Sequence, residues 1–334
     1  MNITVMVNLH ARRGSEAVGG MVSRFLPRAR LALTRSLDEA RAFIAEQVRT
    51  NPPSLLLAGG GDGTITGLIN MLREQGVALP PIGVLPLGTG NAWARVTGAP
   101  KPAVALRQLA ALGERPPPLV PFSLVRLEDK VAPFAGTGWD AQTLQHFKDQ
   151  LAQFPPGPLR QANAGLRGYM GALFTRTIPQ QLFGKRLEVK VYNTGAPALT
   201  VDEHGQVVPL PGGDTGALLY EGPVGIAGAA TTPEFGFSFK AFPFAQAAPG
   251  RLSVRVYAAG ALEGTRNMFK LWRGKHPLPR MYDFLVERLR MDFDRDVPYQ
   301  MGGDIMGIRR SLEFSLAEES VRLVDWRQLK LLVA

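Results

Sequence analysis

The stretch Ala58-Gly-Gly-Gly-Asp-Gly-Thr-Ile-Thr66 decides how this chain folds. It follows the apolar run Ser54–Ala58 and leads into Thr64–Glu74, where apolar residues recur at helical spacing. Glycines let the backbone turn sharply and approach a ligand closely. The start of a helix adds unpaired N–H groups and partial positive charge, which suit phosphate. The stretch therefore predicts a phosphate-binding loop between a strand and a helix, with a plain glycine-rich turn as the alternative.

Asp62 separates this loop from two familiar phosphate motifs. A carboxylate repels phosphate unless Mg²⁺ bridges the two groups, so Asp62 is the candidate metal ligand. No GxxxxGK[ST] pattern occurs, which excludes a Walker A loop. Thr64 stands where a dinucleotide fingerprint needs Gly or Ala, which disfavours a Rossmann oxidoreductase.

A second glycine-rich loop, Pro86–Asn91, follows the apolar run Ile82–Leu85. Because the carboxyl ends of parallel strands share one edge of a sheet, the two loops should converge there. Thr89 and Asn91 offer hydrogen bonds, and Arg95 offers a charge for phosphate. A third polar stretch, Asn8–Gly14, directly follows the first strand, and its Arg12 and Arg13 are either phosphate contacts or an exposed basic turn.

Residues 1 to about 112 alternate between strand and helix patterns. The expected strands are Ile3–Asn8, Ala29–Thr34, Ser54–Ala58 and Ile82–Leu85, and the expected helices are Glu16–Leu26, Ser36–Val48, Thr64–Glu74, Ala92–Arg95 and Ala103–Leu112. This order predicts a mostly parallel sheet with helices on both faces. The three prolines Pro116–Pro118 then break the pattern.

Short strands and turns dominate after the prolines, which predicts an antiparallel β domain. The expected strands are Phe122–Leu127, Val131–Gly136, Leu187–Tyr192, Gly216–Gly222 and Leu252–Ala258. Helical insertions are expected at Ala141–Phe154, Ala164–Arg176 and Leu262–Arg273, and Ser311–Leu332 alternates as strands do. The predicted fold class is therefore α/β followed by all-β.

Composition limits the classes of function. The 334 residues suggest two domains at ~100–200 residues each. The absence of cysteine excludes thiol catalysis, Cys-bound zinc, iron–sulfur clusters and disulfides, and four scattered histidines disfavour a His-built metal site. The net charge of +10 favours an anionic partner or marks a merely basic soluble protein.

Two stretches bear on lipids and membranes. Leu262–Lys275 mixes apolar with basic residues, which suits either an anionic bilayer or a packed helix with a solvated basic face. Aromatic residues alternate in Phe235–Phe242, as in an acyl-pocket wall or an ordinary core. Met1–Gly14 lacks a signal-peptide pattern and no run of ~18 apolar residues occurs, so we expect a cytoplasmic protein with peripheral contact at the inner membrane surface.

These motifs resemble the diacylglycerol kinase catalytic-domain family, the lipid kinases that include bacterial diacylglycerol, sphingosine and ceramide kinases. Gly60–Thr64 matches the GGDGT motif and Pro86–Asn91 matches the second motif. Looser matches follow in order along nearly the whole chain: Asn8–Gly14, with Leu9 replacing Pro, then Gly138–Ala141, Pro243–Leu252 and Tyr299–Ile305.

The resemblance implies two domains and a reaction. Residues 1–118, joined by 308–334, would form the α/β nucleotide-binding domain, and residues 119–307 would form a β-sandwich-like lipid-binding domain with the active site in the cleft between them. The implied activity is transfer of the γ-phosphoryl group of ATP, with Mg²⁺, to the hydroxyl of a lipid alcohol. Diacylglycerol, a sphingoid base, ceramide and a polyprenol all remain open as the lipid.

The resemblance also implies residue roles. Asp304 falls where the family has its catalytic Glu, and Asp62 joins it as a catalytic and metal-binding candidate. The implied nucleotide-binding residues are Asn8, Thr34, Gly60, Gly61, Asp62, Gly63, Thr64, Thr66, Gly88, Thr89, Gly90 and Asn91.

Three positions depart from the family pattern. Gly302 replaces the Asp of the DGE segment, and Ala92 replaces an Asp found in many bacterial members. Pro249 stands where many members have an Asp that helps to hold a structural Mg²⁺. The remaining acidic candidates are Asp62, Asp140 and Asp304.

Two other functions stay open beside the lipid kinase. A catalytically impaired lipid- or nucleotide-binding protein of the same fold would explain the missing acids. An NAD kinase would share the GGDGT type of loop, although its later polar motifs are not found. We expect a lipid alcohol and no nucleic acid as partner, and the sequence leaves a homo-oligomer open.

Overall fold

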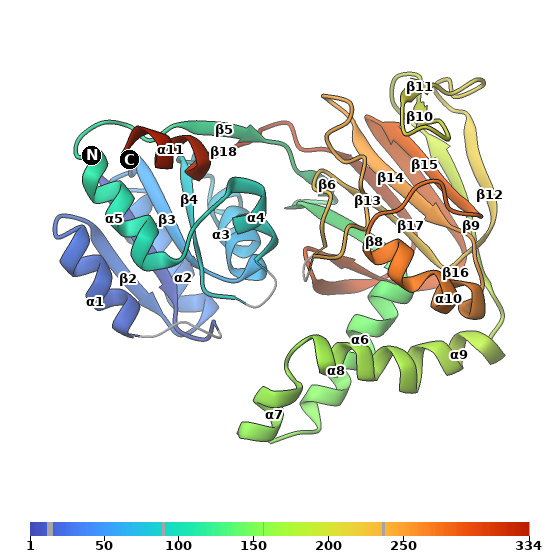
Figure 1. Ribbon diagram of the computed structural model, residues 1–334, viewed down its shortest axis with the longest axis horizontal. Helices are drawn as coiled ribbons and strands as arrows, with labels where there is room; N and C mark the ends of the chain where they lie inside the picture. The colour runs from blue at the N-terminus through green and yellow to red at the C-terminus, as the bar shows by residue number, and fades with distance from the viewer. Residues whose placement is uncertain (12–15, 89–90, 156, 236–237, 334) are drawn as a thin grey trace. The chain divides into compact units, whose positions relative to one another are not determined.

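The computed structural model describes residues 1–11, 16–88, 91–155, 157–235 and 238–333. The chain divides into two compact units, Met1–Ser123 with Glu318–Ala334 (unit 1) and Leu124–Ala317 (unit 2) (Figure 1). The divisions predicted from the sequence lie at 118/119 and 307/308. In the structure both fall later, because a strand after the prolines still belongs to the first sheet and a long strand before Ala317 still belongs to the second.

Unit 1 is built on a six-stranded sheet in the order β2-β1-β3-β4-β18-β5. The strands are β1 (Ile3–Asn8), β2 (Arg30–Thr34), β3 (Leu55–Gly60), β4 (Ile82–Pro86), β5 (Leu119–Phe122) and β18 (Val321–Val324). Each neighbouring pair from β2 to β18 is parallel, and β5 runs antiparallel to β18. The predicted mostly parallel sheet is confirmed.

The helices of unit 1 cover both faces of this sheet. They are α1 (Glu16–Phe25), α2 (Leu37–Phe43) continued by a π-helical turn (Ile44–Val48), α3 (Asp62–Glu74), α4 (Ala92–Thr97), α5 (Pro102–Leu112) and α11 (Trp326–Leu332). Figure 1 shows α1 and α5 on one face, where Val22 and Leu106 pack on the strand residues Val5 and Leu57. The right-handed connections of parallel strands place α2 and α3 on the other face.

The end of the chain returns to unit 1 as a strand and a helix. β18 lies between β4 and β5, with Leu323 opposite Ile82 and Val321 opposite Phe122. The expectation of strand structure up to Leu332 is wrong beyond Val324. The side chain of Asp325 accepts hydrogen bonds from the backbone N–H groups of Arg327 and Gln328, which starts α11 instead.

Unit 2 contains a twelve-stranded antiparallel sheet. Ten strands follow the order β11-β10-β15-β14-β13-β8-β16-β17-β6-β7, and β9 joins β12 to β16. The strands are β6 (Val125–Leu127), β7 (Lys130–Ala132), β8 (Phe134–Gly138), β9 (Leu187–Asn193), β10 (Leu199–Val201), β11 (Val207–Pro209), β12 (Leu218–Val224), β13 (Ile226–Ala230), β14 (Leu252–Tyr257), β15 (Met281–Val286), β16 (Arg288–Met301) and β17 (Asp304–Leu316). This confirms the predicted antiparallel β domain.

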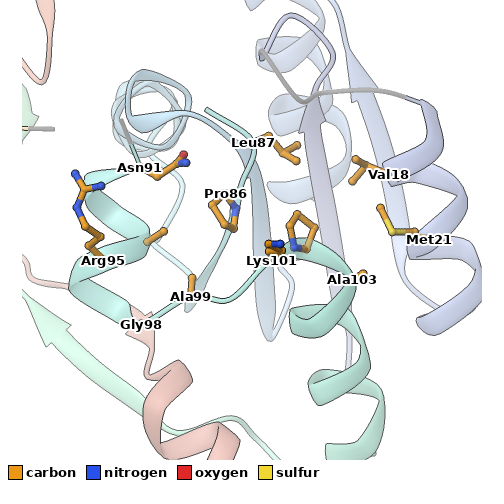
Figure 2. Close-up of a pocket in the computed structure, with 12 residues that line it drawn as sticks. Val18, Met21, Pro86, Leu87, Asn91, Arg95, Gly98, Ala99, Lys101 and Ala103 are labelled. Carbon is orange, nitrogen blue, oxygen red and sulfur yellow. The ribbon is translucent and has the colours of Figure 1, made fainter. Parts of the chain in front are cut away.

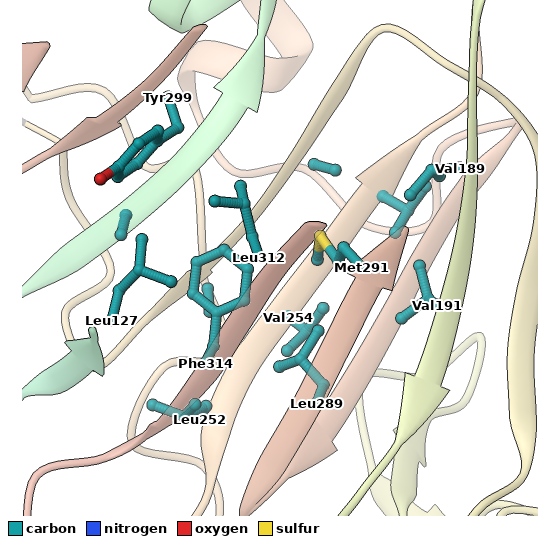
Figure 3. Close-up of a cluster of buried hydrophobic side chains, with 14 of the residues drawn as sticks. Leu127, Val189, Val191, Leu252, Val254, Leu289, Met291, Tyr299, Leu312 and Phe314 are labelled. Atoms are coloured by element: carbon teal, nitrogen blue, oxygen red, sulfur yellow. The ribbon is translucent and has the colours of Figure 1, made fainter. Parts of the chain in front are cut away.

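The core of unit 2 lies between strands far apart in the sequence. Figure 3 shows Val189 and Val191 of β9 with Val254 of β14, Met291 of β16 and Phe314 of β17. The predicted single strand Phe122–Leu127 does not form. Phe122 ends β5 in the first sheet, and Val125 begins β6 in the second.

Helices gather in two insertions of unit 2. They are α6 (Trp139–Ala152), α7 (Pro158–Asn163), α8 (Leu166–Ala172) with a π-helical turn (Leu173–Thr177), α9 (Ile178–Phe183) and α10 (Ala261–Trp272). Helix α7 lies between the expected helices Ala141–Phe154 and Ala164–Arg176, where no helix was predicted. Within the described ranges, no helix combines the length and apolar character of a membrane span.

Candidate functional site

The carboxyl edge of the unit 1 sheet brings the predicted loops together. β1 ends at Asn8 and β2 at Thr34, and these two residues are paired in the sheet. β3 ends at Gly60 and β4 at Pro86, which are also paired. Both glycine-rich loops therefore start at the same level of neighbouring strands, as the sequence predicted.

The two loops touch through their backbones. The N–H of Leu87 donates to the carbonyl of Gly60 at 2.9 Å. A Cβ atom on Gly88 would lie 2.4 Å from the Cα of Gly61, so this approach requires glycine. The Asn91 side chain accepts from the N–H of Gly88 at 3.1 Å and donates to its carbonyl at 2.9 Å. Asn91 is thus held against Gly88, and Gly88 lies against Gly61 of the first loop.

Asp62 joins the same two loops. Its Oδ1 accepts a hydrogen bond from the N–H of Trp93 at 3.1 Å, and the N–H groups of Asn91 and Ala92 also bond to this carboxylate. Burial raises the pKa of Asp62 above its ordinary value, and these backbone amides oppose that shift. The predicted metal ligand therefore already has a structural role, which is to close the start of α4.

Thr66, one of the predicted nucleotide-binding residues, is buried. Its hydroxyl accepts from the indole Nε1 of Trp93 at 3.3 Å, and Trp93 is 2% exposed. The Trp93 ring packs against Phe122 with ring centroids 5.2 Å apart. Thr66 therefore ties the first loop to the core of unit 1.

Four of the predicted nucleotide-binding residues line one pocket. Asn8, Thr34, Gly63 and Thr64 lie around a cavity of about 220 Å³. The Asn8 amide donates to the Thr64 hydroxyl at 3.0 Å, which fixes both side chains at its wall. The other polar residues of this wall, which were not predicted as site residues, are His10, Arg35 and Ser36.

A second, larger pocket lies on the α1 and α5 side of the second loop. Its volume is about 640 Å³, in the range of small-molecule sites. Figure 2 shows Val18 and Met21 of α1 on one side, and Asn91 and Arg95 on the other. Of the predicted residues, Thr89 and Gly90 fall outside the described part of the chain, as do Arg12 and Arg13.

Asp304 begins β17 after a tight hairpin turn. Gly302 and Gly303 have φ values of 57° and 91°, which a two-residue turn of this kind requires and which glycine adopts freely. Gly302 thus has a structural reason to replace the Asp of the family pattern. Asp304 is exposed, and its Oδ1 accepts from the Lys148 ammonium of α6 at 2.9 Å.

Asp140 lies beside the same turn. Its Oδ2 accepts from the Gln300 amide at 3.2 Å, and the Gln300 carbonyl accepts from the N–H of Gly303 at 3.1 Å. Its Oδ1 is buried without a hydrogen-bond partner among the described residues. Burial raises the pKa of Asp140 to about 6. Helix α6 therefore bonds to the hairpin at two places, Lys148 to Asp304 and Asp140 to Gln300. Neither Lys148 nor Gln300 was predicted as a site residue.

A small apolar cavity adjoins Asp140. Its lining includes Asp140, Phe235, Phe239, Phe242, Tyr257 and Leu271. Its volume of about 20 Å³ is enough for about one water molecule. The aromatic stretch Phe235–Phe242 does form one wall of a cavity, with Phe237 outside the described residues, but the cavity holds no acyl chain in this conformation.

Among the described residues, no three His, Asp or Glu side chains gather as a metal site. Asp62 remains as a single carboxylate at the glycine-rich loops.

Comparison with known proteins identifies part of the chain. The diacylglycerol kinase catalytic domain family matches residues 2–117. A probable lipid kinase YegS-like of Klebsiella pneumoniae (strain 342) is 32% identical over 134 residues, which cover 40% of this chain and 41% of that protein. Another from Enterobacter sp. (strain 638) is 43% identical over 83 residues, 25% of this chain and 27% of that protein. The matches thus span about two fifths or less of these relatives.

Solved structures share the fold of nearly the whole chain. A putative diacylglycerol kinase from Bacillus anthracis str. Sterne has a TM-score of 0.65 at 15% identity, covering 97% of both chains. An NAD kinase from Archaeoglobus fulgidus in complex with ATP has a TM-score of 0.52 at 11% identity, covering 99% of this chain and 98% of that one. At these identities the likeness concerns the fold alone. The resemblance predicted from the motifs is confirmed over residues 2–117, which match the diacylglycerol kinase catalytic domain family.

Proposed function

We propose that the protein is an ATP-dependent lipid kinase, which transfers the γ-phosphoryl group to the hydroxyl of a lipid alcohol. The observation that carries the proposal is the pocket at the carboxyl edge of the unit 1 sheet. Asn8, Thr34, Gly63 and Thr64 meet there, inside a domain of the diacylglycerol kinase catalytic family. Relatives of this domain are named probable lipid kinases.

The first part of the reaction is to hold the nucleotide. Phosphoryl transfer depends mainly on positioning the phosphates and neutralising their charge. The thirteen-residue helix α3 begins at Asp62, directly after Gly61, and offers its positive end there. The close approach of Gly61 and Gly88 places these two residues before a ligand arrives, so they need little further ordering on binding.

Mg²⁺ fits this site as a companion of the nucleotide. It commonly takes one or two carboxylates together with phosphate oxygens and water. Asp62 is half-buried and is the carboxylate at these loops, so it would contribute the protein ligand. When bound, the ion neutralises phosphate charge. Because no cluster of three or more acidic or histidine side chains is found among the described residues, phosphate oxygens and water would have to supply the other ligands.

The second part is to accept a proton from the lipid hydroxyl. We assign this role to Asp304, because it is exposed and bonded to Lys148 at the surface. As the hydroxyl oxygen bonds to the γ-phosphorus, its proton passes to the Asp304 carboxylate and the bond to the ADP oxygen breaks. Asp140, with an unpaired buried oxygen beside an apolar cavity, is the second candidate for binding the acceptor hydroxyl.

Labelled ATP and Mg²⁺, with a panel of lipid alcohols in mixed micelles and with NAD in a parallel reaction, test the proposal. We expect label in a lipid and none in NAD. In Gly61→Val, the new side chain would occupy phosphate space, and its Cβ would lie 3.3 Å from the Cα of Gly88. This variant should lose ATP binding and turnover while keeping its circular dichroism spectrum.

Each alternative function has its own outcome. Label in NAD alone would make the protein an NAD kinase. ATP binding without turnover on any acceptor would make it a catalytically impaired binding protein. Unchanged ATP affinity in folded Gly61→Val would remove the glycine-rich loop as the nucleotide site.

A further inference from the structure

Helix α10 buries one face in unit 2 and exposes large apolar side chains on the other. Ala261, Gly264, Asn267 and Leu271 are buried. On the other face, Leu262 is 74% exposed and Phe269 is 78% exposed. Packing on the core therefore explains the buried face of α10 but not its exposed face, where these two apolar side chains remain in water.

Basic residues share the exposed face with these apolar ones. Leu262, Arg266, Phe269 and Arg273 follow one another at spacings of four, three and four residues, which places them along one line of a helix. Lys270 is also exposed and lies next to Phe269 in the sequence. The exposed line of α10 thus alternates between apolar and cationic side chains.

Negative charge is nearly absent from this segment. Between Ala261 and Lys275 the sequence contains four basic residues and a single acidic one, Glu263. Glu263 pairs with Arg280 at 3.3 Å. In the part of the chain that the structure describes, none of the four basic side chains forms an ion pair. Their charges are therefore available to an external anionic surface.

A neighbouring helix adds further apolar surface. α9 lies beside α10 in unit 2 (Figure 1). Phe183, the last residue of α9, is 91% exposed, and Leu182 is 44% exposed. Single exposed apolar residues are ordinary, but several on adjacent helices mark an interaction surface.

We propose that this α9–α10 surface (Leu182, Phe183, Leu262, Arg266, Phe269, Lys270 and Arg273) docks on an anionic lipid bilayer. Apolar side chains insert at the level of the headgroups, and cations pair with anionic lipids. The choice of a bilayer over a protein partner rests on the proposed function, because the acceptor of a lipid kinase resides in a membrane. The charge pattern supplies the independent argument.

Sedimentation of the whole chain with vesicles, in the absence of nucleotide, tests the proposal. Phosphatidylcholine vesicles are compared with vesicles that also contain phosphatidylglycerol, at low and high salt. We expect binding to the anionic vesicles at low salt and its loss as salt rises. Equal binding to both kinds of vesicle, or no binding to either, would overturn the proposal.

Two variants separate the apolar and the cationic contributions. Leu262→Ser/Phe269→Ser should weaken binding about tenfold or more. Arg266→Gln/Lys270→Gln/Arg273→Gln should weaken it on the order of 100-fold, because each cation near an anionic surface contributes about fivefold. The matched controls change exposed residues of unit 1: Leu37→Ser/Leu331→Ser and Arg49→Gln/Arg107→Gln/Lys330→Gln. Equal losses in the controls would assign the effect to general hydrophobicity or charge and overturn the proposal.

Two further measurements separate this proposal from its rivals. If analytical ultracentrifugation shows a dimer that Phe269→Ser dissociates, a second copy covers the surface and the bilayer proposal fails. If the protein binds no vesicles but phosphorylates a short-chain lipid in solution, the proposed kinase activity holds and the proposed membrane-binding surface is wrong. If the protein binds anionic vesicles but shows no turnover, the membrane-binding surface holds and the proposed kinase activity is wrong.

Discussion

The carboxyl edge of unit 1 and the hairpin turn of unit 2 use their polar side chains in opposite ways. At the edge of unit 1, the polar side chains of the motifs are bonded within the unit: Asn8 to Thr64, and Asp62 to the backbone of Trp93. At the hairpin of unit 2, Asp304 makes one exposed ion pair, and Asp140 leaves an oxygen without a partner among the described residues.

This difference indicates that the edge of unit 1 is preorganised for binding, whereas the carboxylates near the hairpin of unit 2 are available to react. Side chains that bond to one another hold a binding site in shape, but changing any of them also disturbs its neighbours. Carboxylates with few local bonds add little to the fold and remain free for chemistry. Substitutions in unit 1 should therefore change stability and nucleotide affinity together, whereas substitutions at the hairpin should change turnover without loss of stability.

Asp304→Asn should show the largest effect. Turnover should fall by ~10²–10⁴-fold, as general base catalysis contributes. ATP affinity and melting temperature should stay close to those of the wild type, because an exposed ion pair contributes at most about 1 kcal/mol. Steady-state kinetics, ATP titration and thermal unfolding on one preparation measure all three.

Lys148→Met is the matched control, since it removes the same ion pair and keeps the carboxylate. A loss of turnover as large as that of Asp304→Asn would mean that the ion pair matters rather than the base. Normal turnover in Asp304→Asn would transfer the role of base to Asp140 or Asp62.

Asp140→Asn should stabilise the protein at neutral and alkaline pH. The pKa of Asp140 is raised from 3.8 to about 6 in the fold, so its contribution to stability is complete below pH 3.8 and is lost as the pH rises through 6. The neutral amide avoids this loss. Urea unfolding should show a gain of up to about 3 kcal/mol at pH 8 that disappears near pH 4. A variant less stable than the wild type at pH 8 would show that the Asp140 carboxylate has a favourable partner in solution.

Gly88→Ala should disturb unit 1 at the contact of its two loops. The new Cβ would lie 2.4 Å from the Cα of Gly61, and such overpacking costs about 1–3 kcal/mol. Melting temperature and ATP affinity should fall together. Gly20→Ala in α1 is the matched control: its Cβ would meet nothing within 4 Å, so it should stabilise by about 0.5–1 kcal/mol. Unchanged ATP affinity in Gly88→Ala would show that the contact does not shape the site.

Local patterns predicted most of unit 1. Strand Ile3–Asn8 was predicted at its observed bounds, and helix Ala103–Leu112 differs from α5 by one residue. The strands over Met281–Met301 were not predicted, although Leu289, Met291 and Phe293 alternate there with charged residues. That alternation is typical of a strand with one buried face and could have identified β16.

The partners of the site residues could not be predicted in this way. Asp62 bonds to Trp93 across 31 positions, and Lys148 bonds to Asp304 across 156. Such pairs depend on how strands and helices are placed by the whole fold, whereas propensity and periodicity describe only neighbours in sequence. The motif positions were therefore predictable, but the structural role of Asp62 and the pairing of Asp140 with Gln300 were not.

The position of β18 has a consequence for how the protein is made. β18 lies between β4 and β5, yet its first residue leaves the ribosome roughly 235 residues after β4 ends at Pro86. At about 5–20 residues per second, the edge of β4 waits roughly 10–50 s for its partner. Unpaired strand edges invite association with other chains, so nascent protein is exposed to that hazard throughout the synthesis of unit 2. The sheet that carries the glycine-rich loops is begun first and completed last.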